Sequence, residues 1–146
     1  MDKRLSLFFL LLAITVNSTA QSITQLTKTA DSLLKNEAYE GSLKVRNKIL
    51  TQISPKQTEL YAQQKYKQQF TEAQLAATPA IAVDKAKISL NFFNQLKDKP
   101  ITEQIDLYNL LYHSLAYNNQ REEALAVALK SYKNIQSVNN RESPGR

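Results

Sequence analysis

The sequence NEAYEGSLKVRNKIL, residues Asn36–Leu50, is the most informative part of the chain, because an altered copy, NQREEALAVALKSY, returns at Asn119–Tyr132. Five positions recur 82 residues apart: Glu40, Ser42, Leu43, Val45 and Lys48 align with Glu122, Ala124, Leu125, Val127 and Lys130. A weaker third copy lies halfway, at Ala80–Leu90. Each copy predicts a helix with a small residue near its start: Ser42, Ala82 and Ala124. Self-similarity at a period of ~34–47 residues is typical of stacked helical hairpins.

Composition points the same way and excludes several classes of protein. The chain has 146 residues, enough for one domain, and 42% of them are hydrophobic. Only two residues are Gly, which argues against a β sandwich, a Rossmann fold or a phosphate-binding loop. Cys is absent, so disulfides, thiolate metal sites and a Cys nucleophile are excluded. The formal net charge of +6 is spread along the sequence without a basic stripe, so nucleic acid is not an expected partner.

The N-terminus reads as a secretory signal peptide at residues 1–20. Lys3 and Arg4 precede the apolar run LSLFFLLLAITV, Leu5–Val16, and small residues then lead to a predicted cleavage site after Ala20. The run of 12 is short for a membrane span, which needs ~20 residues, although an uncleaved signal anchor is the competing interpretation. We therefore expect an exported protein, periplasmic or extracellular, with no stable membrane insertion after cleavage.

Apolar residues recurring every three or four positions predict six helices and no strand. They are Gln21–Asn36, Tyr39–Ile53, Pro55–Ala76, Pro79–Leu96, Pro100–Asn118 and Arg121–Val138. Ser54 and Thr78 each precede a Pro, which is a helix-start signal. Short connections make neighbouring helices antiparallel. The predicted fold is all-α, with three stacked antiparallel hairpins forming one domain at residues 21–138, followed by a flexible tail at 139–146.

The same pattern assigns faces to the helices. In the second helix, Lys44, Arg46, Asn47 and Lys48 are predicted to face outward. In the third, the outward set is Lys65, Lys67, Gln68 and Gln69. In the sixth, the inward set is Ala124, Leu125, Ala128, Leu129, Tyr132 and Ile135. This last helix has no obvious polar outer face, which solenoid ends need, so the chain could be the amino-terminal fragment of a longer repeat-containing regulator.

The first hairpin resembles the tetratricopeptide repeat. Ala30 stands at the small position of that family's first helix, Leu33 at its large position, Tyr39 at the turn aromatic and Ser42 at the small position of its second helix. The third hairpin, beginning LYNLLYHSLAY at Leu107–Tyr117, is also similar, but its turn is two residues shorter than the family's and lacks the turn Gly and aromatic. The middle hairpin departs most from the motif. Other six-helix bundles or solenoids remain the alternative.

The resemblance implies a groove, lined by the first helix of each hairpin, that binds a peptide or partner protein. The matching candidate residues are Thr24, Thr27, Asp31, Tyr108 and Asn118. Exported members of the family often belong to envelope proteins or to the sensor parts of regulators. The leading hypothesis is thus a non-enzymatic interaction module of the cell envelope, whose partner is another envelope or secreted protein or peptide. A solvated groove that binds nothing is an equally good interpretation of these five residues.

No arrangement of residues predicts catalysis. His113 is the only histidine, lies off the apolar stripe and has no nearby acid and nucleophile to form a catalytic set. The adjacent carboxylates Glu122 and Glu123 suit the helix dipole and do not face each other. We expect no metal, no cofactor and no enzyme activity.

Aromatic residues suggest two further possibilities. Tyr61 and Phe92 lie off the main stripes, where an exposed ring would mark an interface. Tyr66, Phe70 and Phe93 could instead line a pocket between hairpins, as in a small-ligand sensor or carrier. Aromatics at helical spacing are more often part of the core.

Overall fold

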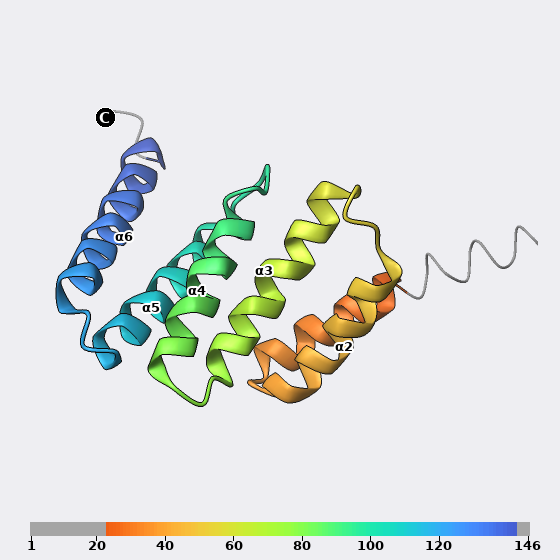
Figure 1. Cartoon of the computed structure of the whole chain (residues 1–146). Helices are drawn as coiled ribbons and strands as arrows, with labels where there is room; N and C mark the ends of the chain where they lie inside the picture. Colours follow the sequence, from red (N-terminus) through yellow and green to blue (C-terminus); the bar gives the residue numbers. More distant parts are fainter. Residues whose placement is uncertain (1–22, 143–146) are drawn as a thin grey trace, which may run out of the picture. The chain divides into compact units, whose positions relative to one another are not determined.

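The computed structural model describes residues 23–142, with side chains to residue 136, and this part of the chain is all-helical (Figure 1). Six helices and no strand occur within it, which confirms the predicted all-α class. They are a helix over residues 23–35, α2 (Tyr39–Gln52), α3 (Thr58–Gln74), α4 (Pro79–Phe93), α5 (Ile101–Tyr117) and α6 (Arg121–Glu142). The predicted signal peptide lies outside the described residues. The predicted tail begins inside α6, which continues to Glu142.

The chain divides into two compact units, Met1–Gln52 and Ile53–Arg146, with the boundary inside the predicted domain of residues 21–138. The described part of the first unit is one hairpin, residues 23–35 and α2. Its two helices meet where both side chains are small: the hydroxyl of Ser42 donates to the carbonyl of Ala30 at 2.9 Å, and both residues are fully buried. Small residues allow this close approach, as the sequence predicts.

The turn of this hairpin reappears in the second unit between α5 and α6. Glu37 and Asn119 occupy the left-handed region, with φ of 57° and 61°. The same two backbone hydrogen bonds close each turn: Ala38 N to Leu33 O (2.9 Å) and Glu37 N to Leu34 O (3.0 Å), then Gln120 N to Leu115 O (2.9 Å) and Asn119 N to Ala116 O (3.2 Å). This is the Schellman arrangement that ends a helix on a left-handed residue. Every atom pair is shifted by 82 positions, the spacing at which the sequence repeats.

Helices α3 to α6 of the second unit alternate in direction and pack in chain order, with a smaller contact between α3 and α5 (Figure 1). The start of α4 agrees with its prediction, since the Thr78 hydroxyl accepts from the Ile81 amide at 3.3 Å and Pro79 is the first helical residue. α3 begins at Thr58 rather than Pro55. Residues 54–57 form a turn instead, in which the Ser54 amide donates to Gln57 Oε1 at 3.3 Å.

Two clusters of buried side chains form the core of this unit. The first joins the end of α3 to the facing sides of α4, α5 and α6: Ala73, Val83, Ala86, Leu111, Leu115 and Ala124. The second joins the start of α3 to the end of α4 and the start of α5: Ala62, Tyr66, Phe93, Leu96 and Leu107. Ser89 crosses between helices in the same way as Ser42, because its buried hydroxyl donates to Tyr66 O at 2.6 Å. Ala82, predicted as the equivalent of Ser42, is only partly buried.

Several polar residues predicted to face outward are buried. Arg46 is fully buried, and its Nη2 lies 2.6 Å from Asp31 Oδ1. Gln68 and Gln69 are 9% and 7% exposed, and Gln69 Nε2 donates to Glu72 Oε2 at 3.2 Å. Long polar side chains can be buried when other polar groups satisfy them, and residue type alone does not reveal such a partner.

Candidate functional site

The groove residues predicted in the first unit differ in their exposure and in their contacts within the hairpin. Thr24 is exposed and Thr27 is partly buried. Asp31 is held in the ion pair with Arg46, although its side chain remains 39% exposed. Its carboxylate therefore stabilises the hairpin, and a ligand would have to share it with the guanidinium.

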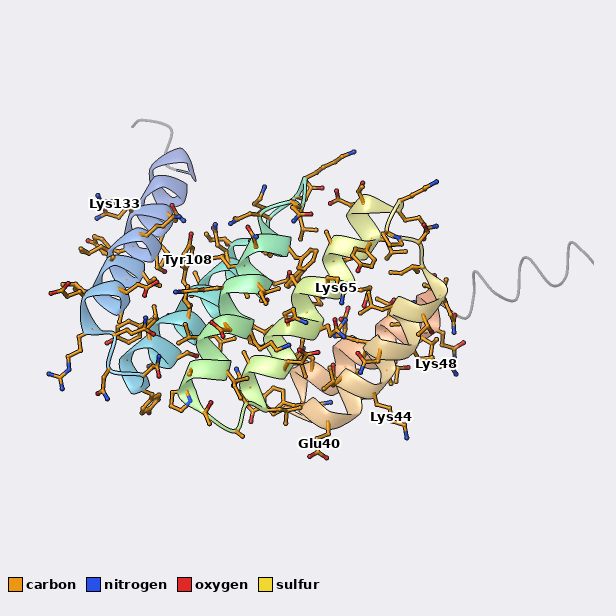
Figure 2. The ribbon with its side chains drawn as sticks, in the orientation of Figure 1. Glu40, Lys44, Lys48, Lys65, Tyr108 and Lys133 are labelled. Carbon is orange, nitrogen blue, oxygen red and sulfur yellow. The ribbon has the colours of Figure 1, made fainter. Side chains whose placement is uncertain are left out.

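The groove residues predicted in the second unit make internal contacts. Tyr108, which Figure 2 labels, is only 4% exposed, and its hydroxyl lies 3.5 Å from Asn134 Nδ2 on α6. Asn118 is partly buried in the turn, and its Nδ2 donates to Gln120 Oε1 at 2.7 Å. The ring of Tyr108 thus packs between α5 and α6 instead of lining an open surface. The groove as a binding site stays a prediction.

The aromatic residues pack against one another. Tyr61 and Phe92 form an edge-to-face pair with ring centroids 6.2 Å apart, so these rings join α3 to α4 and are both partly buried. Tyr66 and Phe93, candidates for lining a pocket, form a second such pair at 5.2 Å and are 3% and 0% exposed. These ring contacts join α3 to α4.

The remaining features are His113, the acidic residues and the apolar character of the helices. His113 is exposed, as expected, and its ring contacts that of Tyr112 with centroids 5.0 Å apart. Within residues 23–142, no three His, Asp or Glu side chains gather as a metal-binding group. Among the helices described, none has the length and apolar character to cross a membrane.

Three exposed apolar side chains form a stripe on α6, which we call the α6 stripe: Leu125, Leu129 and Tyr132. These side chains are 61%, 53% and 60% exposed. Their spacing of four and three residues places them on one side of the helix over ~10 Å. All three are predicted from the sequence to face inward, and the structure corrects that prediction. Single exposed apolar residues are ordinary, whereas contiguous groups of them are a common feature of interaction surfaces.

The stripe is exposed because α6 has more apolar surface than its neighbours cover. The helix packs against α5 through Ala124, which is buried, and Val127, which is partly buried. An ion pair of 2.7 Å between Glu123 and Lys87 fastens the start of α6 to α4. Six consecutive apolar residues, 124–129, span more than a full turn and cannot all face α5. That run is the signal in the sequence that could have revealed the stripe.

Exposed charged residues border the stripe: Arg121 and Glu122 lie at its start, on opposite flanks, and Lys133 lies at its end. Glu122 and Lys133 are both exposed, and Figure 2 labels Lys133 on α6. At 100° per residue they lie about 60° and 80° around the helix from Leu125, on the same flank of the stripe. The side-chain amide of Gln136 donates to the Tyr132 hydroxyl at 2.7 Å. The hydroxyl of Tyr132 is therefore directed along the helix.

A second pair of exposed apolar residues, on α4, is less suited to binding. Ile81 and Ile88 are 45% and 42% exposed and lie two turns apart. The exposed Asp84 and the partly buried Lys85 come between them, and Lys85 pairs with Glu72 at 2.5 Å. Charged groups thus interrupt this face, whereas the α6 stripe is continuous.

Comparison of the chain with known protein families, with curated proteins and with solved structures finds no match.

Proposed function

We propose that this chain is an exported, non-enzymatic interaction module of the cell envelope, built from stacked tetratricopeptide-like hairpins. It binds a protein partner through an exposed helix face. The observation that carries the proposal is the α6 stripe, three large apolar side chains each more than half exposed on one side of one helix. Covering such a surface is favourable by about 25 cal/mol per Å² of apolar area removed from water.

The helical-repeat part of the proposal is supported by the two turns that share their hydrogen bonds at an offset of 82 residues. The turn centred on Glu37 and the turn centred on Asn119 use the same left-handed residue and the same pair of amide donors. Agreement of sequence and backbone at one spacing favours two copies of a common hairpin unit.

The export part is supported by the sequence alone. A basic start, an apolar run at Leu5–Val16 and a small residue at position 20 predict a signal peptide. The intact mass of the protein recovered from the producing cell tests this. Loss of residues 1–20 is the expected result, and a chain that retains them in the cytoplasmic fraction would contradict export.

Site-specific photo-crosslinking tests binding at the stripe. A photoreactive phenylalanine analogue replaces Leu129 in the full-length chain in living cells, and the same analogue at Asn91, exposed on α4, is the matched control. We expect a discrete crosslinked species from position 129 that is absent from position 91. A second substitution in the stripe, Leu125→Glu, should remove that species because it places a charge in the apolar surface. Equal crosslinking from both positions, or none from 129, would contradict the proposal.

A further inference from the structure

We propose that the partner of the α6 stripe is α6 of a second copy of this chain, packed antiparallel about a two-fold axis near Ala128 and Leu129. This inference rests on the proposed function, because it names the occupant of the same surface. Three observations carry it: the position of the stripe along α6, the charges that border it and the extent of the surface.

The stripe is self-complementary in an antiparallel arrangement. Its midpoint lies at residues 128–129, so the axis places Leu125 of one copy level with Tyr132 of the other and brings the two Leu129 side chains together. A two-fold interface uses the same patch on both subunits, and this patch has a large side chain at each end and one at the centre. Side chains spaced by four and three residues can interdigitate with the same pattern on a facing helix.

The charges on the flank of the stripe favour antiparallel packing. Glu122 and Lys133 occupy one flank of the stripe, and in an antiparallel pair each flank meets its own equivalent. Glu122 of one copy then lies beside Lys133 of the other, with levels about two residues or ~3 Å apart, and the two-fold axis makes this contact twice. In a parallel pair the two-fold axis runs along the helices and puts the equivalent flanks of the two copies on opposite sides of the interface, so Glu122 and Lys133 cannot meet there. Glu123 does not compete, because it is paired with Lys87 at 2.7 Å.

The small extent of the surface points to a weak dimer. One helix face is smaller than the ~800 Å² per partner of a standard interface, so we expect a weak, reversible dimer in the micromolar range. The opposed helix dipoles of an antiparallel pair favour the same direction as the charges.

Charge-swap variants in sedimentation experiments test the proposal. The protein is purified after expression of the full-length coding sequence, and its dimer dissociation constant is measured for the wild type, Glu122→Lys, Lys133→Glu and the double variant. We expect each single change to raise the constant by about threefold to tenfold, as for exposed ion pairs made twice. The double variant, which restores both pairs with their signs exchanged, should return to within about twofold of the wild type.

Matched controls use the same charge changes elsewhere. Glu40 and Lys48, labelled in Figure 2, are both exposed on α2. Glu40→Lys, Lys48→Glu and their double variant alter the net charge by the same amounts and should leave the dissociation constant unchanged. Leu129→Ser should abolish the dimer. Circular dichroism identifies any variant that has lost its helices, and 0.5 M salt should remove the difference between the wild type and Glu122→Lys, because exposed pairs are screened.

The outcomes separate this inference from the proposed function. Weakening by both single variants and recovery in the double variant supports antiparallel self-association. A dimer that Leu129→Ser abolishes but that the double variant does not recover overturns the antiparallel geometry. A monomer at all concentrations, together with a crosslink from position 129 to a different protein, overturns the second copy as partner and leaves the proposed function standing. A monomer with no position-specific crosslink contradicts both.

Discussion

The first hairpin, residues 23–52, and the last, α5 with α6, share a turn but not the contacts that hold their helices together. Both turns have a left-handed residue, Glu37 or Asn119, and the same backbone hydrogen bonds. In the first hairpin, the Ser42 hydroxyl and the pair of Arg46 with Asp31 then join the helices. The residues 82 positions on from these three are Ala124, Ala128 and His113, which make neither contact.

This difference separates the features that the two hairpins share from those in which they differ. The turn depends on backbone groups that every residue has, so it persists although Glu37 and Asn119 differ. The contacts between helices depend on side chains, so they diverge between copies. Exposure diverges as well: Leu43 is partly buried, whereas Leu125, at the equivalent position, is 61% exposed. An exposed apolar surface can thus arise on one of two hairpins whose turns share their backbone hydrogen bonds.

The largest expected effect concerns the ion pair that only the first hairpin has. Asp31→Ala leaves the guanidinium of Arg46 buried without its carboxylate, and we expect it to destabilise this hairpin by about 2–4 kcal/mol, below the fully buried range because Asp31 is 39% exposed. Arg46→Met removes the buried charge and should therefore destabilise the hairpin less than Asp31→Ala does. The equivalent change in the last hairpin, His113→Ala, should stay within ~0.5 kcal/mol, since His113 is exposed. Hydrogen exchange of the amides in α2 measures the effect, and a greater loss from Arg46→Met than from Asp31→Ala would contradict this account.

A smaller effect concerns the hydroxyl that crosses between helices. Ser42→Ala removes the donor to Ala30 O, and Ser89→Ala the donor to Tyr66 O, so each should cost about 1 kcal/mol in urea denaturation. Ala124→Ser sharpens the comparison. If the last hairpin has the same helix spacing as the first, the new hydroxyl reaches a carbonyl on α5 and the change stays within ~0.5 kcal/mol. A cost well above 1 kcal/mol would show that the two contacts are not equivalent.

The turns themselves should respond to Gly in proportion to the strain of the residue replaced. Glu37→Gly should raise the free energy of unfolding by about 0.5–1 kcal/mol, because Gly adopts positive φ without the steric cost of a side chain. Asn119→Gly should gain less, because Asn tolerates the left-handed region better than most residues. Denaturant titration of both variants provides the measurement. An equal or larger gain at Asn119 would show that the turns differ in more than residue type.

The smallest effect is a dependence on alkaline pH in the first hairpin, which arises from Tyr39. Burial, with the charge of Glu37 as a second cause, raises the pKa of Tyr39 above its ordinary value of 10.0. The unfolded chain then loses this proton at lower pH than the folded one, so the contribution of Tyr39 is complete below pH 10 and declines as pH rises through the folded pKa. Tyr39→Phe should reduce the loss of protection in α2 above pH 10. The equivalent residue in α6 is Arg121, so the last hairpin should lack this component. An unchanged pH profile in Tyr39→Phe would contradict it.

Apolar periodicity and helix-start signals in the sequence predict the all-α class and the six helices, to within a few residues at most ends. Those features depend on local chemistry: apolar spacing and the Thr78–Pro79 start. Only the tertiary structure decided which faces are covered. The packing buries Arg46, Gln68 and Gln69, places Tyr108 and the Tyr66–Phe93 pair in the interior, and leaves Leu125, Leu129 and Tyr132 exposed. The physical reason is that periodicity identifies apolar residues, whereas their exposure depends on how much of each helix its neighbours cover. The run at 124–129 has apolar residues on all sides of α6, and α5 covers only one side of the helix.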